Sequence, residues 1–508
     1  MHPTILKYVL IYLLSVVSLA INAQTTQPTS SKSKIEILSA DELVYNQQAG
    51  RYQMCRGNVR FKQGSTYMNC DSARFYEEVN RIEAFGNIYI RQKDTVDLWG
   101  GYLEYDGDLR LAKLKKNVRL TDGKMRLNTE QLNYDMVDKV GYYTNGGDIK
   151  NGEDRLYSER GTYFSRSKEF HFKDSVRLYN PEYRMESDTL RYNKASKIAT
   201  FLGPTFIYSE ENTIFCKYGW YDTDKNISQF SKGAYIEGAQ NRLQADSMMY
   251  FRNTGEGEAF GNLRLVDTLE EVTITGQYGN YQRFTKTTMI TGDPIAMKRI
   301  DEDSFYLSAD TFVDRVDTSI AQKRLLHAYR NVVAYKSDIQ AVSDSMSYNF
   351  TDSIIGFFDD PILWTDSNQI TGDTILVYQN KFGLEKLEAF KSGFVIERDP
   401  NDLYNQIKGK QITAHFEEGA IYKVDVNGNG QSIYYAREDS TKYAGVNEVV
   451  CGKMTINIDP NNKIRTIVFT QKPKAKFYPL EKFPVSNSRL PQFKWYEDKR
   501  PKRSFFKY

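Results

Sequence analysis

Acidic side chains recur at one position of a repeated five-residue pattern. The pattern reads Asp-x-apolar-x-Tyr, and its clearest copies begin at Asp41, Asp188, Asp246 and Asp344. Two carboxylates on either side of a glycosidic bond could act as the general acid and base of a glycosidase. Recurrence in register is more typical of side chains that hold a turn or a strand ladder. We therefore interpret these carboxylates as structural and predict no catalytic residue.

The other side chains that could bind a metal or take part in catalysis are few and scattered. The four histidines are His2, His171, His327 and His415. The sequence contains no His-Glu-x-x-His zinc motif, no Gly-x-Ser-x-Gly nucleophile motif and no glycine-rich phosphate-binding loop. We predict a protein that is not an enzyme and that needs no metal or cofactor.

The four cysteines are Cys55, Cys70, Cys216 and Cys451, too few to support so long a chain as a disulfide scaffold. Cys55 and Cys70 flank a predicted strand and turn that could bring them opposite each other. Two interpretations stay open for this pair, a disulfide or two ordinary buried thiols.

Charge and composition narrow the function further. The 508 residues include 68 Lys+Arg and 65 Asp+Glu, which gives a net charge of +3. So small a net charge provides no large positive field, and we predict no nucleic-acid partner. Aromatic residues make up 14% of the chain, which excludes bulk disorder because disordered segments are poor in aromatic residues.

Aromatic residues recur with a period of about 29 residues, which identifies a repeat protein. The members of this column are Tyr45, Phe75, Tyr105, Tyr134, Tyr163, Tyr192, Tyr221 and Tyr250. The residues around them alternate between apolar and polar, as in a strand with one buried face, here the face that carries Leu43 and Tyr45. We predict an all-β fold of roughly a dozen repeats, stacked in one direction as antiparallel strand pairs.

A second pattern follows each of these strands and predicts a kink. Its copies are Gly57-Asn58, Gly86-Asn87, Lys116-Asn117, Gly261-Asn262 and Arg330-Asn331. Glycine and asparagine tolerate a positive φ better than other residues do. The strand behind each kink has alternate apolar residues that face one way, for example Val59 and Phe61.

The two ends of the chain differ from the repeat array. Residues 8–19 are apolar apart from Ser15 and Ser18, a run shorter than the ~20 residues of a membrane span and typical of a signal peptide. We predict a signal peptide at 1–23, a polar linker at 24–34, the array at 35–471 and a Pro-rich basic tail at 472–508 that is extended or disordered. The mature protein is then exported and soluble, with retention of the signal as an anchor left open.

Three short blocks make the array recognisable. They are Ile82-Glu83-Ala84-Phe85-Gly86-Asn87-Ile88, its echo Gly257-Glu258-Ala259-Phe260-Gly261-Asn262-Leu263, and the shorter Leu387-Glu388-Ala389-Phe390. Together with the repeat they resemble the OstA/LptA family of periplasmic lipopolysaccharide-transport proteins, in a long version with many repeats. The resemblance implies an open β-jelly roll, a V-shaped pair of sheets whose apolar interior holds the acyl chains. It also implies a periplasmic location, and edge-strand pairing with transport components of the inner and outer membranes.

The residues that would line such an interior are the inward apolar positions of the predicted strands. They are Leu43, Val59, Phe61, Ile88, Ile90, Leu103, Val118, Leu120, Leu190, Leu263 and Leu265. A lipid carrier needs this column to be open. A surface or periplasmic β-rod that binds or processes glycans needs clustered carboxylates and outward aromatic residues instead, and a structural stalk needs only a closed core.

Overall fold

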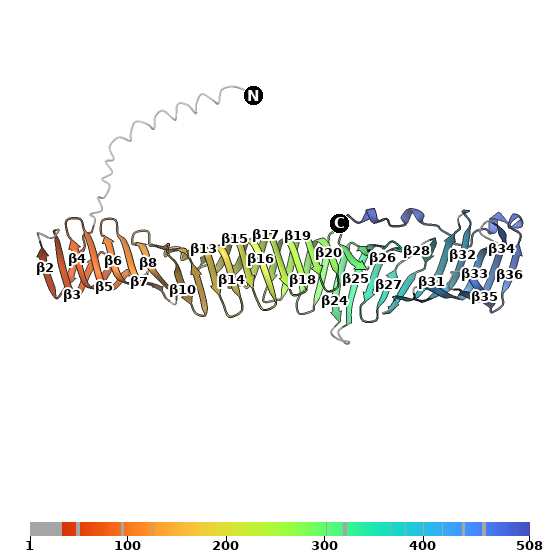
Figure 1. The fold of residues 1–508 in the computed structure, drawn as a ribbon, viewed down its shortest axis with the longest axis horizontal. Coiled ribbons are helices and arrows are strands. Elements are labelled where there is room, and N and C mark those ends of the chain that lie inside the picture. The colour runs from red at the N-terminus through yellow and green to blue at the C-terminus, as the bar shows by residue number, and fades with distance from the viewer. Residues whose placement is uncertain are drawn as a thin grey trace, which may run out of the picture. The chain divides into compact units, whose positions relative to one another are not determined.

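The computed structural model describes residues 33–507, except 47–50, 93–95, 124, 301, 318–322, 366, 381–382, 400, 419, 439–441 and 460–463. The predicted signal peptide and most of the predicted linker lie outside the described residues. The chain divides into two compact units, unit 1 (Met1–Ile149) and unit 2 (Lys150–Tyr508). The two units are described separately (Figure 1).

Unit 1 is built from antiparallel strands that pair with their neighbours in the sequence. They are β1 (Glu36–Ser39), β2 (Glu42–Asn46), β3 (Tyr52–Gln63), β4 (Thr66–Tyr76), β5 (Arg81–Gln92), β6 (Asp97–Asp106), β7 (Leu111–Asp122), β8 (Met125–Asp135) and β9 (Val140–Tyr143). Strand β10 (Gly147–Asn151) spans the boundary between the units.

Unit 2 continues with the same kind of pairing. Its strands are β11 (Asp154–Ser158), β12 (Arg160–Phe164), β13 (Glu169–Tyr179), β14 (Arg184–Asn193), β15 (Ile198–Tyr208), β16 (Asn212–Asp222), β17 (Ile227–Gly238), β18 (Asn241–Phe251), β19 (Glu256–Asp267), β20 (Val272–Gln282), β21 (Thr287–Thr291), β22 (Ile295–Ile300), β23 (Asp303–Ser308), β24 (Thr311–Asp317), β25 (Lys323–Tyr335), β26 (Ile339–Asn349), β27 (Ile354–Phe358), β28 (Ile362–Thr365), β29 (Asn368–Thr371), β30 (Thr374–Asn380), β31 (Gly383–Arg398), β32 (Tyr404–Glu417), β33 (Ala420–Arg437), β34 (Tyr443–Ile458), β35 (Ile464–Thr470) and β36 (Lys474–Tyr478).

The prediction of an all-β fold is confirmed. Within the described residues the helical segments are four 3-10 turns, η1 (Leu480–Lys482), η2 (Val485–Asn487), η3 (Glu497–Lys499) and η4 (Arg503–Phe505). In the same part of the chain, no helix has the length and apolar character needed to cross a membrane.

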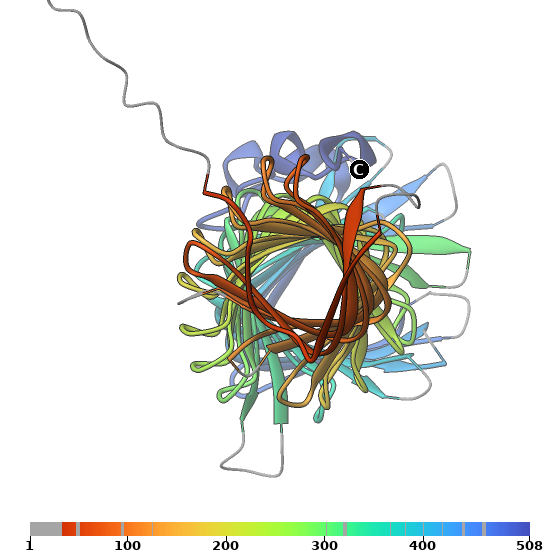
Figure 2. The same cartoon turned by 90° about the vertical axis from the view of Figure 1, so that its left-hand side faces the viewer.

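The predicted kinks divide the long strands into two halves. The five Gly-Asn-like pairs all have positive φ, and the strand register shifts at each of them, for example between Arg56 and Val59 of β3. The halves of neighbouring strands pair into two walls that share the line of kinks. Figure 2 shows this bend end-on in the strands of unit 1, coloured red to orange. We call the far edge of each wall, where the turns lie, its rim.

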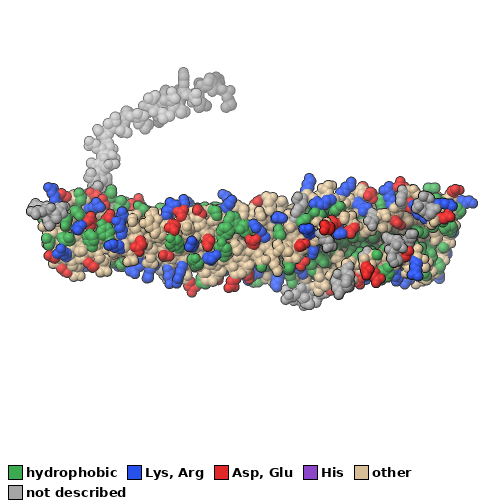
Figure 3. Space-filling model, in the orientation of Figure 1, with side chains coloured by type: hydrophobic (Ala, Val, Ile, Leu, Met, Phe, Trp, Pro, Cys, Tyr) green, Lys and Arg blue, Asp and Glu red, His purple; other side chains and the backbone are tan. Residues whose placement is uncertain are grey.

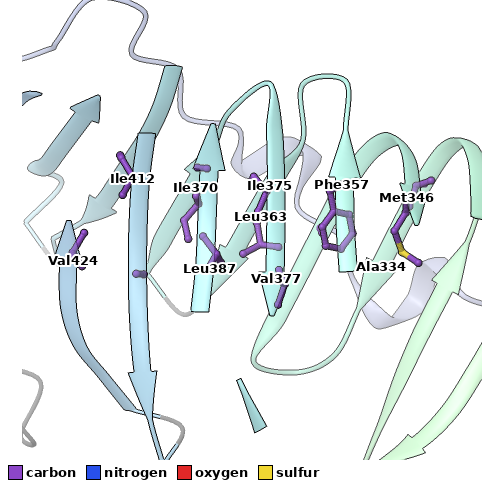
Figure 4. Packing of buried hydrophobic residues seen from close by; sticks show 14 of the residues in the cluster. Ala334, Met346, Phe357, Leu363, Ile370, Ile375, Val377, Leu387, Ile412 and Val424 are labelled. Atoms are coloured by element: carbon purple, nitrogen blue, oxygen red, sulfur yellow. The ribbon is translucent and has the colours of Figure 1, made fainter. Parts of the chain in front are cut away.

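The core lies between the walls. In unit 1 its residues include Ile82, Leu103 and Leu114, each at most 1% exposed. In the C-terminal part of unit 2, side chains from several strands pack together, among them Phe357, Leu363 and Ile375 (Figure 4).

The C-terminal tail, for which we expected an extended or a disordered chain, is ordered in the described residues. It begins with β36, which pairs with β34, and then runs back beside the strands of unit 2 (Figure 1). Its side chains Phe483, Leu490 and Phe506 are at most 9% exposed. The tail is therefore extended between its 3-10 turns but packed, because apolar anchors spaced along it meet an apolar surface.

Candidate functional site

The recurring carboxylates hold the kinks in place. The side-chain amide of Asn58 donates to Asp41 over 2.9 Å, and the corresponding bonds are Asn87 to Asp71 at 2.9 Å, Asn262 to Asp246 at 2.8 Å and Asn331 to Asp310 at 3.0 Å. Asp71 and Asp246 lie in the strand before the kinked one, and Asp41 and Asp310 lie directly before such a strand. The structural interpretation is confirmed for Asp41 and Asp246. Asp188 packs against the kink residue Gly203, whereas Asp344 accepts a hydrogen bond from its neighbour Ser345.

Kinked strands in register align their inward apolar residues into continuous rows across β13 to β20 of unit 2. One row runs over seven strands, and its successive partners are Met185, Ile207, Ile214, Ile236, Leu243, Leu265 and Ile274. All of them except Met185 are half-buried. We call this the open row, because its side chains keep part of their surface accessible.

A second row crosses β13 to β19 on the other wall and is buried throughout. Its successive partners are Phe172, Leu190, Phe201, Gly219, Phe230, Met248 and Ala259. Unit 2 thus has two parallel apolar rows, one packed and one partly accessible. Figure 3 shows hydrophobic side chains within a hollow on the drawn face of the C-terminal part of unit 2, with charged side chains along its edges.

The predicted lining residues fall into three groups, which are nine packed side chains, the half-buried Leu265 and the exposed Leu43. Val59, Phe61, Ile88, Ile90, Leu103, Val118, Leu120, Leu190 and Leu263 are at most 3% exposed, so they are packed into the core. Leu265 is half-buried in the open row.

Leu43 departs from the expected buried face. It pairs with Cys55 on the inward side, but it is 56% exposed, and Tyr45 is 60% exposed. The reason is that β2 pairs with β3 on one side, and no other strand of the described residues pairs with it. A pocket of about 420 Å³ opens at this end of unit 1, between Tyr45, Phe75 and the charged side chains of Lys34, Arg51 and Glu77.

The rims of unit 1 are joined by buried amide side chains. Gln63, at the end of one wall, donates over 2.8 Å to the carbonyl of Gly107 on the other, and Gln92 donates over 3.0 Å to the carbonyl of Met136. The hydroxyl of Tyr105 donates to Gln63 as well. These contacts close the interior of unit 1 along its rims.

The rims of unit 2 meet through an exposed ion pair. Arg252, just after β18, pairs with Glu182 in the turn between β13 and β14. The two side chains are 45% and 61% exposed, and exposed pairs of this kind contribute little stability. The half-buried open row therefore lies behind a weaker closure than the core of unit 1.

The titratable groups are consistent with structural roles. Cys55 and Cys70 are free, buried thiols, so the disulfide that the sequence left open is not formed. Burial raises the pKa of Cys55 to about 11 and that of Cys70 to about 12. Across the described residues there is no cluster of three or more His, Cys, Asp or Glu that could hold a metal ion.

Sequence reasoning missed a second apolar surface, on the outer face of unit 2 beneath the tail. Its signal was present in runs such as Phe394-Val395-Ile396, which do not alternate. Continuous apolar runs are typical of strands buried on both faces. Val395 lies beside the inner core, whereas Phe394 and Ile396 pack with the tail residues Phe483 and Leu490.

Comparison with known proteins supports the family resemblance. Residues 32–188 match the family of OstA-like proteins, and the sequence block Ile82–Ile88 lies within this range. Among solved structures, the chain is similar to LptH of Pseudomonas aeruginosa, described as the LptA-homologous periplasmic component of the lipopolysaccharide transport device. The identity is 16%, the match covers 28% of this chain and 93% of LptH, and the TM-score is 0.21. No curated protein matches the chain.

Proposed function

We propose that this OstA/LptA-like chain carries lipopolysaccharide or a related glycolipid through the periplasm for assembly of the outer membrane. In this proposal the acyl chains lie between the two walls of unit 2, against the open row, and the sugars stay in water. The edge strands β2 and β35 pair with transport components of the inner and outer membranes, and the chain acts as a bridge rather than as an enzyme.

The observation that carries this proposal is the continuity of the open row. Acyl chains make no directional bonds, so they require an apolar surface without polar interruption. Each methylene transferred from water to such a surface gains about 0.8 kcal/mol. The row offers an apolar side chain on each of seven successive strands. Neighbouring strands are about 4.8 Å apart, so an acyl chain can lie across several of them.

The contrast between the rims supports unit 2 as the place where lipid enters. Opening unit 1 would break buried amide hydrogen bonds, whereas opening unit 2 near β18 requires separation of the exposed Arg252–Glu182 pair. A buried hydrogen-bonding group left without a partner costs about 1–3 kcal/mol, more than an exposed ion pair contributes.

A binding measurement with two matched variants tests the proposal. Leu243→Asn places an amide in the open row, and Gln244→Asn changes the adjacent exposed, outward residue. We expect Leu243→Asn to weaken the binding of fluorescently labelled lipopolysaccharide to the purified protein about tenfold, because a polar group then faces the acyl chains. Gln244→Asn should bind as the wild type does. Equal affinities for all three proteins would contradict the proposal.

A further inference from the structure

The outer face of unit 2 carries a buried row in which glutamine and apolar side chains alternate. Its successive cross-strand partners are Gln340, Trp364, Gln369, Ile396, Gln406 and Ile433. All six are at most 4% exposed. We call this the outer row. The C-terminal segment 480–506, which we call the strap, covers it.

The strap is held by apolar and aromatic anchors at intervals. Leu490 and Phe483 pack with Ile396 and Ile433. The ring of Phe493 lies 5.3 Å from that of Tyr404, and the ring of Phe506 lies 5.4 Å from that of Tyr306. The anchors therefore reach from β33 back to β23.

Two glutamines of the outer row form the same pair of hydrogen bonds with the main chain of the strap. Gln406 donates to the carbonyl of Ser488 over 2.9 Å and accepts from the amide of Leu490 over 2.8 Å. Gln369 donates to the carbonyl of Lys494 over 2.8 Å and accepts from the amide of Tyr496 over 2.8 Å. Each side chain thus satisfies a carbonyl and an amide two residues apart, as a partner strand would.

The spacing of the two contacts along the strap matches their spacing across the strands. They are six residues apart in the strap, and their glutamines are two strands apart, a distance of about 9.6 Å. The turn in which the amide of Phe493 donates to the carbonyl of Leu490 shortens the strap to fit this distance. The outer row therefore repeats, at two positions, a glutamine side chain that binds a peptide main chain.

The contact between the strap and the outer row leaves buried hydrogen-bond donors unsatisfied. The indole nitrogens of Trp364, in the outer row, and Trp495, in the strap, are buried without a hydrogen-bond partner in the part of the chain that the structure describes. A buried donor without an acceptor lowers the affinity of the two surfaces for each other.

From these contacts we infer that the outer row of unit 2 is a peptide-binding site and that the strap is its resident ligand, which can detach while the strands stay folded. The ligand is an extended peptide with the sequence of the strap, recognised through its main chain by Gln369 and Gln406 and through its aromatic anchors. Detachment exposes an apolar strip beside the edge strands β35 and β36.

The test uses a full-length chain whose strap is disabled by Leu490→Asp, Phe493→Ser and Phe506→Ser. A labelled synthetic peptide of residues 480–507 should bind this chain saturably, as measured by fluorescence anisotropy, and a scrambled peptide should not. Adding Gln369→Leu and Gln406→Leu should weaken binding at least about tenfold, because four hydrogen bonds to the peptide main chain are lost. Adding Gln282→Leu instead, an exposed glutamine of β20, should leave the affinity unchanged.

Absence of saturable binding to a strap-disabled chain with folded strands would overturn the inference, as would equal affinities for the two glutamine variants. Hydrogen exchange of the unmodified protein decides the matter if the disabled chain does not fold. The amides of Leu490 and Tyr496 should then exchange faster than those of β29 and β32. If they exchange only together with the strands, the strap belongs to the core and the inference is wrong.

Discussion

The kink at Gly261 provides a quantitative test of how the repeats hold their shape. Gly261 has φ +70°, and a Cβ added there would lie 2.5 Å from the carboxylate of Asp246. Gly261→Ala should therefore incur the left-handed backbone cost of about 1–2 kcal/mol. It should also displace Asp246 from Asn262, with a further loss of about 0.5–1.5 kcal/mol.

Gly233 supplies a matched control, because it lies at the corresponding kink of β17. It has φ +77°, and nothing lies within 4 Å of an added Cβ. Gly233→Ala should incur the backbone cost alone. Asp246→Ala combined with Gly261→Ala should destabilise by less than the sum of the two single changes, since both remove the same hydrogen bond.

The assay is hydrogen exchange of the backbone amides of β17 to β19, which reports local opening free energies in each variant. We expect Gly261→Ala to lower the opening free energy more than Gly233→Ala does. Equal losses for the two variants would refute the conclusion that the Asp–Asn contact stabilises the kink.

Three other perturbations have expected outcomes. The side chain of Leu114 is 0% exposed, so Leu114→Ala should destabilise unit 1 by about 2–5 kcal/mol in urea unfolding. The side chain of Leu109 is 60% exposed, so the control Leu109→Ala should change stability by less than about 0.5 kcal/mol. Burial alone would raise the pKa of Asp399, but hydrogen bonds from Arg437 and Tyr443 outweigh it and hold that pKa below its usual value. The stabilisation from Asp399 should then be complete above the unfolded pKa of about 3.9 and lost as the pH falls through the folded pKa. An Asp399→Asn variant should therefore be less stable than the wild type at pH 7. The stabilities of the two proteins should converge in acid unfolding. Burial raises the pKa of Cys55 to about 11 and that of Cys216 to about 12. A thiol reagent at pH 8 should therefore label these residues only after unfolding. Rapid labelling of the folded protein would contradict their burial.

Much of the fold was predictable because its signals are local. Gly261-Asn262 predicts a positive φ from residue type alone, and the alternation of Leu263 and Leu265 predicts an inward face. The partner of Asn262 could be anticipated only in part, because Asp246 lies sixteen residues earlier and is brought close by strand pairing. The recurrence of the aspartates was the signal in the sequence that indicated this contact.

The features that the sequence did not predict depend on contacts between distant segments. Gln63 meets Gly107 and Gln92 meets Met136 through the closure of the walls, and no local pattern distinguishes these glutamines from solvent-exposed ones. The strap was expected to be extended or disordered because proline and basic residues are frequent in it. Its order comes from apolar anchors and from Gln369 and Gln406, which are more than 80 residues away from their strap partners in the sequence.

The central claim is that acyl chains contact the open row of unit 2. The most direct measurement is photo-crosslinking in cells, with a benzophenone amino acid at the inward positions Leu243 and Leu265 and, as matched controls, at the adjacent outward positions Gln244 and Arg264. We predict adducts with lipopolysaccharide at the two inward positions only. Adducts at none of the four positions, or equally at all of them, in folded and exported protein would contradict the account.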